Sequence, residues 1–267
     1  MIERKVWFET KDELYLSGIL TKPEKTNKCV ILCHGLGLSK DFPKAFARLA
    51  EKLSDQGIAC LRFDFRGHGE SQSKPVEMTI EGETKDIEAA IKFTKSKGYK
   101  KFAIIATSFA GGPTLVYAKK HKISSIVLIC SLIDYHSILK PRQIKTGHLS
   151  DEIANSIEEL FIKHKIKEMK KKGYVKIGMH FKLGMPLFKE LETLEPWKIL
   201  KNLNTPVLFI HGTRDIVIPV NDSIKYSKIA KTGKLALIKG AGHGFEKEEH
   251  LQLVATHISK FLKKNMK

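Results

Sequence analysis

The sequence predicts an α/β fold in which helices cover both faces of a mostly parallel central sheet. Short, nearly continuous apolar runs alternate along the chain with longer segments in which apolar residues recur at helical spacing. This alternation is typical of parallel sheets with helices on both sides. Strands that are buried on both faces are continuously apolar, as these runs are. One α/β domain can accommodate all 267 residues.

The composition is globular and gives no sign of export. Hydrophobic residues make up 42% of the chain and charged residues 28%, which is enough apolar material for a large core. No uncharged apolar run approaches the length of about 20 residues that a membrane span needs. Residues 1–9 carry charge where a signal peptide has its apolar stretch. We therefore expect a cytoplasmic protein without a membrane span.

The first third of the chain already shows the alternation. Residues 6–10 and 14–21 alternate in polarity on either side of a short polar turn, which predicts a β-hairpin. After the hairpin we expect a strand, a helix and a strand, over 28–33, 42–56 and 58–63. Gly57 follows this helix and is expected to end it.

The same alternation continues to the C-terminus. Further strands are expected over 101–107, 124–130, 206–210 and 235–238. Further helices are expected over 79–97, 109–121, 223–230 and 248–262. Right-handed crossovers bring the carboxyl ends of parallel strands to one edge of the sheet, where ligands bind in such folds.

Residues 133–197 interrupt the alternation. They begin just after one predicted strand, end before the next, and include a helical segment over 151–171. A long insertion at the carboxyl end of a strand usually lies over the active-site edge. We therefore expect a small lid over 133–197, inserted into a core domain made of 1–132 and 198–267.

The chain is strongly basic. Lys and Arg number 47 against 29 Asp and Glu, a net charge of +18, and a basic balance suggests nucleic acid as a partner. Only six of these 47 residues are Arg, the side chain that bidentate recognition of phosphate and guanine favours. We expect a lysine-rich solvated surface and no specific nucleic-acid partner. Nonspecific binding to anionic polymers, which salt would abolish, is the alternative.

The four cysteines, Cys29, Cys33, Cys60 and Cys130, lie in apolar runs and form no CxxC pair. A disulfide between Cys29 and Cys33 on one strand is geometrically poor. We expect four buried free thiols and no metal site.

A serine stands at a predicted strand–helix turn. Ser108 follows the strand 101–107 in the segment Ala106-Thr-Ser-Phe-Ala-Gly-Gly112. Such a turn projects the hydroxyl above the edge of the sheet, and small residues two before and two after the serine let strand and helix approach closely. An ordinary turn with an incidental serine is the alternative.

Two later strand ends supply the partners that a nucleophilic serine needs. Asp215 comes just after the strand 206–210, and His243 just after the strand 235–238. A serine hydroxyl needs a base, and the base needs a carboxylate that fixes its tautomer. A lone loop Asp or His is most often structural, but all three residues here follow strands in the order Ser, acid, His. We therefore expect Ser108, Asp215 and His243 to be the catalytic residues.

The segment His34-Gly-Leu-Gly37 directly follows another predicted strand. Its glycines permit a tight backbone path. We expect the backbone N–H groups of Leu36 and Phe109 to form an oxyanion hole facing the serine.

Other polar residues near these strand ends are interpreted as structural. His34 and His211 each precede a glycine at a strand end, and we expect both to hydrogen-bond loop backbone. Asp64 and Arg66 are expected to pair with each other and so to hold the loop that follows the strand 58–63.

The motifs HGLG, DFRGHGES, ATSFAGG, HGTRDIVIP and GAGHGF together resemble the α/β-hydrolase superfamily of serine hydrolases over nearly the whole chain. Within it, the chain resembles small-lid bacterial carboxylesterases, which include cinnamoyl and feruloyl esterases and monoacylglycerol lipases. The resemblance implies that Ser108 is the nucleophile, His243 the general base and then acid, and Asp215 the orienting carboxylate. The family usually has glycine where Ala106 and Ala110 flank the serine here.

We expect a carboxylic ester hydrolase that acts through an acyl-enzyme on small to medium acyl or aromatic esters. Related hydrolases that cleave haloalkanes and epoxides use Asp in place of Ser108. An acyltransferase or peptidase with the same triad remains an alternative, as does a noncatalytic binding protein on this fold. The expected partner is a small-molecule ester, with no metal or organic cofactor, and the expected state is a monomer or homodimer.

The predicted lid also supplies candidate substrate contacts. Tyr174, Phe181 and Phe188 are the aromatic side chains that we expect to line a pocket for the acyl or alcohol group. The alternative is that they form the lid's own core.

Overall fold

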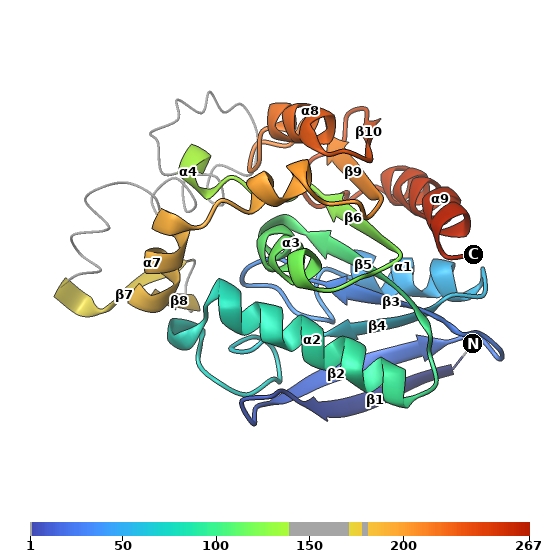
Figure 1. The fold of residues 1–267 in the computed structure, drawn as a ribbon, viewed down its shortest axis with the longest axis horizontal. Coiled ribbons are helices and arrows are strands. Elements are labelled where there is room, and N and C mark those ends of the chain that lie inside the picture. Colours follow the sequence, from blue (N-terminus) through green and yellow to red (C-terminus); the bar gives the residue numbers. More distant parts are fainter. Residues whose placement is uncertain (1, 139–170, 178–180) are drawn as a thin grey trace.

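Eight strands form the central sheet of the computed structural model, which describes residues 2–138, 171–177 and 181–267 (Figure 1). Their spatial order is β1-β2-β4-β3-β5-β6-β9-β10. The antiparallel strands β1 and β2 form one edge, and all pairs from β4 to β10 are parallel. The strands are β1 (Ile2–Glu9), β2 (Tyr15–Lys22), β3 (Lys28–Cys33), β4 (Ala59–Phe63), β5 (Lys101–Thr107), β6 (Ser125–Ile129), β9 (Val207–Gly212) and β10 (Gly233–Ile238).

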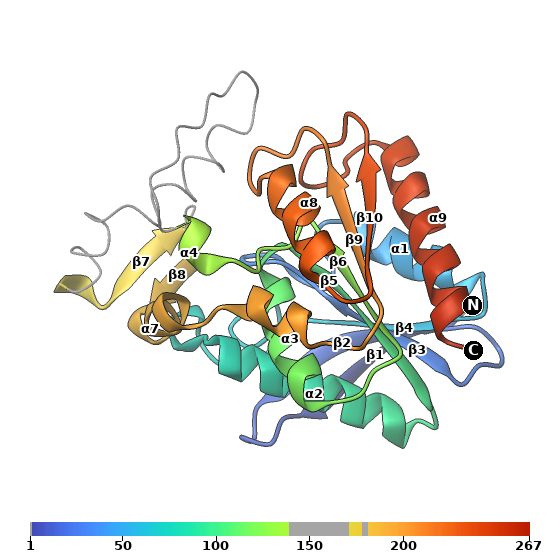
Figure 2. The same ribbon diagram turned by 45° about the horizontal axis from the view of Figure 1, so that its top comes forward.

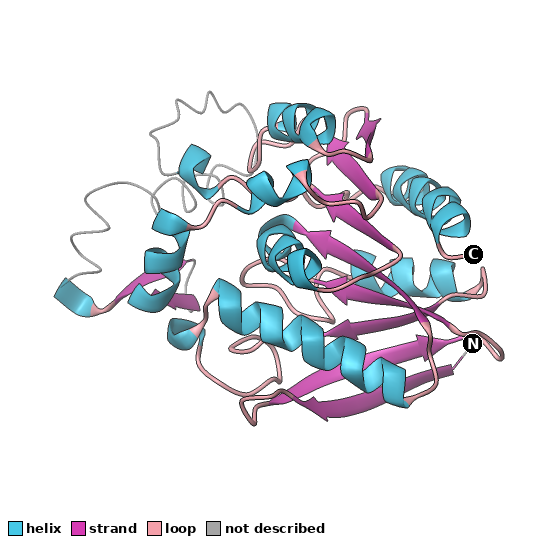
Figure 3. Ribbon diagram, viewed as in Figure 1, coloured by secondary structure: helices cyan, strands magenta, loops and turns pink. Residues whose placement is uncertain are grey.

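Helices cover both faces of this sheet (Figures 1 and 3). One face carries α1 (Ala45–Ser54) and α9 (Glu248–Asn265). The other carries α2 (Ile80–Ser96), α3 (Gly111–Lys120) and α8 (Val220–Ile229). Within the described residues the short 3₁₀ helices are η1 (Pro75–Glu77), η2 (Ser108–Ala110) and η3 (Pro196–Lys201). The predicted α/β fold is therefore confirmed.

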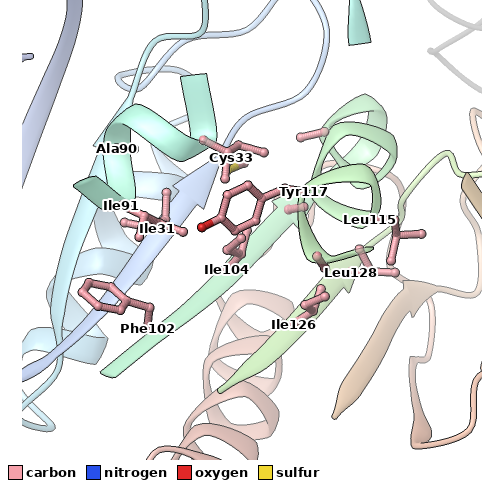
Figure 4. Packing of buried hydrophobic residues seen from close by; sticks show 14 of the residues in the cluster. Ile31, Cys33, Ala90, Ile91, Phe102, Ile104, Leu115, Tyr117, Ile126 and Leu128 are labelled. Atoms are coloured by element: carbon pink, nitrogen blue, oxygen red, sulfur yellow. The ribbon is translucent and has the colours of Figure 1, made fainter. Parts of the chain in front are cut away.

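The continuous apolar runs are explained by burial on both faces. In β3, Cys29, Ile31 and Cys33 belong to the core under α2 and α3, whereas Val30 and Leu32 belong to the core under α1 and α9. Figure 4 shows Ile31 and Cys33 on the α3 side, close to other buried side chains of that layer. Every residue after the first of this strand is buried, so a polar side chain at any of them would lose its hydration.

The described parts of the insertion lie beyond the edge at which the parallel strands end (Figure 2). They are α4 (Tyr135–Ile138), β7 (Tyr174–Ile177), β8 (Phe181–Gly184) and α7 (Met185–Thr193). β7 and β8 form a separate antiparallel pair. Val175, Leu183 and Leu187 pack with Phe109, which directly follows Ser108. This cluster ties the insertion to the sheet edge that carries the serine.

Three predicted helix starts differ from those observed by two or three residues, and a further predicted helix lies almost wholly outside the described residues. The helix predicted over 223–230 begins earlier, at Val220, directly after Pro219. The first helix begins at Ala45 rather than at residue 42, because a residue that precedes a proline, as Phe42 does, is kept out of helical conformation. The helix after Ser108 begins at Gly111, preceded by the short 3₁₀ turn. The predicted helix over 151–171 lies outside the described residues except for its last residue.

The expected pair between Asp64 and Arg66 is wrong. Asp64 instead accepts from the buried ammonium of Lys40 at 3.0 Å, and Arg66 bonds Asp86 at 2.7 Å and Asp12 at 2.9 Å. Asp64 and Arg66 are close in sequence, but their side chains have different partners. The three ion pairs hold the loop after β4 to the loop after β3, to α2 and to the turn between β1 and β2.

No helix within the described residues is both long and apolar enough to cross a bilayer.

Replacing Arg66 with Ala should destabilise the fold strongly. Asp86 has a fully buried side chain, and removing its partner leaves an uncompensated buried charge, which costs about 3–5 kcal/mol. Arg48→Ala is the matched control, because its pair with Glu248 is solvent-exposed and such pairs contribute about 0–1 kcal/mol. Urea unfolding of the three proteins measures both effects, and equal losses would contradict this assignment.

Candidate active site

Ser108 lies at the sharp turn between β5 and α3. Its φ of +50° is in the left-handed region, which non-glycine residues adopt only where the surroundings enforce it. Its carbonyl accepts a hydrogen bond from the N–H of Leu132 at 2.9 Å, which links the turn to the end of β6. The strained turn lifts the side chain out of the strand and above the edge of the sheet.

Gly35 packs directly against this serine. A Cβ atom at position 35 would lie 2.9 Å from Ser108 Cβ and 3.5 Å from its Oγ. Behind the serine, a Cβ at Gly111 would lie 2.7 Å from Ser131 Cβ, and one at Gly112 would lie 1.6 Å from the Tyr135 hydroxyl. Gly35 of the HGLG segment and the two glycines of the ATSFAGG segment therefore allow neighbouring groups to approach the backbone closely around Ser108.

Asp215 and His243 are hydrogen-bonded to each other. Asp215 follows β9 and His243 follows β10, and the distance from His243 Nδ1 to Asp215 Oδ2 is 2.8 Å. The other carboxylate oxygen accepts the N–H groups of Val217 at 2.8 Å and Ile218 at 2.9 Å. These bonds fix the carboxylate and orient the imidazole. Its donor nitrogen is assigned by the acceptor it faces, so Nδ1 carries the proton and Nε2 is free to accept one.

His211 is a further donor to Asp215 that the sequence did not reveal. Its Nε2 lies 3.0 Å from the carbonyl of Ile218, the expected backbone bond, and also 3.1 Å from Asp215 Oδ2. Because a carbonyl only accepts, Nε2 must carry the proton, and Nδ1 then accepts from the Ser223 hydroxyl at 2.7 Å. The spacing of four residues between His211 and Asp215 was the only signal available in the sequence.

These donors decide the charge of Asp215. Burial by itself would raise the pKa of this carboxyl group, but hydrogen bonds from His211 and His243 outweigh burial and leave its pKa well below the ordinary value. The carboxylate is therefore ionised at neutral pH. A fixed negative charge beside Nδ1 stabilises an imidazolium form of His243.

Ser108 and His243 line the same hollow. This small hollow is mostly apolar, and Ile129, Phe245 and Leu251 are among its lining residues. The side chain of His243 is 26% exposed, so it can reach a bound molecule. Two more non-glycine residues with positive φ line the hollow, Cys130 at +44° and Phe245 at +52°.

The loop after β3 is held beside Ser108 by two buried histidines. His68 Nε2 accepts the N–H of Gly37 at 3.1 Å, and His34 Nε2 accepts the N–H of Phe65 at 3.1 Å. Within the described residues the Leu36 N–H has no protein acceptor. Phe109 is in the first turn of a helix, where N–H groups lack intrahelical acceptors. An oxyanion hole formed by these two groups stays a prediction.

Both loop histidines are neutral. Burial lowers the pKa of His34 to about 4 and that of His68 to about 3. An imidazolium has no acceptor nitrogen, so only the neutral form can hold Gly37 and Phe65. The loop that carries Leu36 is therefore fixed by groups that must remain uncharged.

Cys130, Asp215 and His243 form a compact group in which one potential ligand atom from each lies within 4.8 Å of the others. These are residue types that bind zinc. However, burial and the charge of Asp215 raise the pKa of the Cys130 thiol well above its ordinary value, and the Asp215–His243 hydrogen bond already uses two of the ligand atoms. The group is therefore suited to a hydrogen-bonded cluster rather than to a metal centre.

The three candidate pocket aromatics occupy different environments. Phe188 is buried within the apolar cluster of the insertion. Phe181 packs on that cluster and contacts the ring of His68, with 4.7 Å between centroids. The ring of Tyr174 lies 4.6 Å from the ammonium of Lys182. Their contact with substrate stays a prediction.

Comparison with known families identifies the chain. Residues 24–250 match the family Hydrolase_4, described as serine aminopeptidase, S33. The chain belongs to this family. The S33 match covers the strand ends that carry Ser108, Asp215 and His243, and it confirms the resemblance to α/β hydrolases.

Individual relatives of this S33 member are distant. The quorum-quenching protein AidA of Acinetobacter baumannii is 29% identical over 136 residues, 48% of this chain and only 44% of that relative. The (R)-3-hydroxydecanoyl-ACP:CoA transacylase of Pseudomonas putida is 26% identical over 76% of this chain and 73% of its own length. The structure of Est1E from Butyrivibrio proteoclasticus with bound ferulic acid has a TM-score of 0.78 at 19% identity, covering 97% of this chain and 98% of that one. It shows the shared α/β-hydrolase fold.

Acid should weaken the fold through the two neutral histidines. Their folded pKa values of about 4 and about 3 lie below the unfolded value of about 6.5. The unfolded chain therefore binds protons that the folded chain does not, and stability falls as the pH drops below about 7. Each histidine accounts for a loss of about 2 kcal/mol between about pH 7 and pH 5.

The test is urea unfolding of His68→Gln at these two pH values. The glutamine oxygen can still accept from Gly37 but does not titrate, so the pH-dependent loss should shrink by about 2 kcal/mol. His257→Gln, at an exposed position of α9, is the control and should keep the wild-type loss. A His68→Gln protein with the wild-type loss would refute the role given to this histidine.

Proposed function

We propose that the protein is a serine carboxylic ester hydrolase that acts through an acyl-enzyme on small to medium acyl or aromatic esters. The observation that carries the proposal is the arrangement of Ser108 and His243. Ser108 stands on a left-handed turn at the end of β5 and shares a hollow with His243, whose Nδ1 bonds a buried carboxylate. Membership of a hydrolase family supports the same chemistry.

Acylation begins with proton transfer. Nε2 of His243 takes the proton of the Ser108 hydroxyl while Oγ attacks the ester carbonyl carbon, and the carbonyl oxygen becomes an oxyanion. Asp215 does not take a proton but stabilises the resulting imidazolium. The imidazolium then gives its proton to the alcohol oxygen as the carbon–oxygen bond breaks. The alcohol leaves, and the acyl group stays on Ser108.

Water completes the cycle in the same site. His243 removes a proton from water, the hydroxide attacks the acyl-enzyme, and the proton passes to Ser108 as the acid is released. The N–H groups of Leu36 and Phe109 are the donors for the oxyanion in both halves. Preorganised donors of this kind typically contribute about 2.7–4 kcal/mol each to transition-state stabilisation.

The proposed substrate range follows from the surroundings of the serine. The hollow at Ser108 is bounded largely by aliphatic and aromatic side chains, which suits an apolar acyl group. In our proposal residues 133–197 act as a lid over this edge, and Tyr174, Phe181 and Phe188 contact the bound ester. The ferulic acid named for Est1E is an aromatic acid, which supports the inclusion of aromatic esters in the proposed range.

An acyltransferase is the second candidate. The Pseudomonas putida relative is named a transacylase, and the same acyl-enzyme serves whether water or another nucleophile accepts the acyl group. Release of free acid in the presence of added alcohols and thiols separates the two functions. An enzyme that releases alcohol quickly but forms acid only slowly until an acceptor is added is a transferase.

Ser108→Ala should abolish hydrolysis of p-nitrophenyl esters, tested from acetate to decanoate. Removing a nucleophile that acts together with its base typically lowers kcat by about 10⁴-fold or more. Ser131→Ala is the matched control, because Ser131 is a buried serine at the neighbouring strand end whose hydroxyl bonds the Ala106 carbonyl. It should retain most activity.

Activity that survives in Ser108→Ala would mean that another residue is the nucleophile. No activity in the wild type, together with no labelling of Ser108 by a fluorophosphonate, would favour a noncatalytic binding protein. Cleavage of aminoacyl p-nitroanilides in preference to esters would favour a peptidase, the activity in the family's description.

A further inference from the structure

We propose that a groove beside His243 binds the alcohol part of the ester and selects alcohols with an apolar body and an anionic end, a carboxylate or a phosphate. This inference rests on the proposed ester hydrolysis and specifies its substrate. It comes from a groove that contains two triad residues, Asp215 and His243, but is otherwise lined by residues outside the triad and the insertion.

The groove adjoins the hollow that contains Ser108. It has a volume of about 1080 Å³. Leu38, His243 and Phe245 line both cavities. His243 thus stands at both cavities, so we place a molecule whose carbonyl lies at Ser108 with its other end past His243, in the groove.

The position of His243 determines which part of the ester enters. As general acid it must reach the oxygen of the leaving alcohol. The alcohol part of the ester therefore lies on the His243 side of the carbonyl. Because His243 lines the groove, we assign the groove to the alcohol part and the hollow at Ser108 to the acyl part.

Part of the lining of the groove is apolar. Phe42, which is 64% exposed, lines it together with Leu38 and Val217. A large aromatic side chain left open to solvent loses apolar contact that a ligand can restore. An aromatic or aliphatic body of the alcohol fits this part of the groove.

The rim is basic. Four cations line the groove, Lys44, Arg48, Arg214 and Lys247, against one exposed acid, Glu246. Asp215 also lines it, but its carboxylate is already bonded to His243 and to backbone N–H groups. Arg48 is paired with Glu248. The groove therefore carries a surplus of positive charge.

Two of these cations are available to a ligand. Lys44 and Arg214 are both exposed, and among the described residues neither has an acidic side chain within ion-pair distance. They come from different parts of the chain, the start of α1 and the loop after β9, and meet at one groove. The first turn of α1 contains no acidic residue, so its positive dipole end is not compensated there. An anion bound in this part of the groove would be attracted by Lys44, by Arg214 and by the amino end of α1.

The test compares three aryl esters of similar size that differ in the presence and place of a charge. The butyrate of 4-hydroxybenzoate has its carboxylate in the alcohol part, the butyrate of 4-hydroxybenzamide is neutral, and the phenyl hemiester of glutaric acid has its carboxylate in the acyl part. For the wild type, kcat/KM should be highest for the first ester. The ratio of the first to the second should fall with added salt.

The decisive variant is Lys44→Glu/Arg214→Glu. Reversing two exposed charges should lower the anionic-to-neutral ratio of kcat/KM by about tenfold. Lys100→Glu/Lys122→Glu is the matched control: it changes the net charge equally, but at exposed loop residues before β5 and β6, at the opposite edge of the sheet. It should keep the wild-type ratio.

Three results would overturn the proposal. They are an unchanged ratio in Lys44→Glu/Arg214→Glu, an equal fall in the control variant, and a wild-type preference for the charged acyl part. Failure to cleave even the neutral butyrate would instead count against the ester hydrolase. Titration calorimetry with 4-hydroxybenzoate and 4-hydroxybenzamide would then test binding to the groove independently of catalysis. Equal binding of the two would refute the charge selectivity of the groove.

Discussion

The active edge of this protein is organised around one buried negative charge. A carboxylate without contact to water is tolerated only when its oxygens are fully hydrogen-bonded, and Asp215 meets this condition with two backbone N–H groups and two imidazoles. These donors come from β9, from the loop after it and from the loop after β10. Satisfying the charge therefore fixes the two strand ends relative to each other, and His243 takes its orientation from that requirement.

The opposite side of Ser108 is held by a different kind of interaction. Neutral imidazoles bind the loop after β3 through their acceptor nitrogens, while the buried Lys40–Asp64 pair anchors the end of the same loop. One side of the serine thus depends on a permanent charge and the other on groups that must stay uncharged. The proposed chemistry needs both, because a base must be oriented on one side and an oxyanion stabilised on the other.

Much of this arrangement could be predicted from the sequence, and the exceptions share a cause. Strands buried on both faces leave a continuous apolar signature, so the sheet and the strand-end positions of Ser108, Asp215 and His243 could be inferred. The partners of polar residues in the loops could not be inferred in this way. Asp64 and Arg66 are two residues apart yet select Lys40 and Asp86, because direction in a loop depends on turns that periodicity does not encode. The hydrogen bond of His211 to Asp215 and the presence of Lys44 and Arg214 in one groove depend likewise on how distant strand ends are brought together.

The left-handed residues around the hollow have a consequence for heat tolerance. Ser108, Cys130 and Phe245 each adopt a positive φ, and such a conformation costs about 1–3 kcal/mol for a residue with a side chain. The sheet and its two helical layers must hold a reserve of stability large enough to keep all three in place. Selection for thermostability alone would relax these positions first, and the gain would come from the residues that shape the cavity beside the serine. In this protein the same few backbone angles lower thermal stability and shape the cavity beside Ser108.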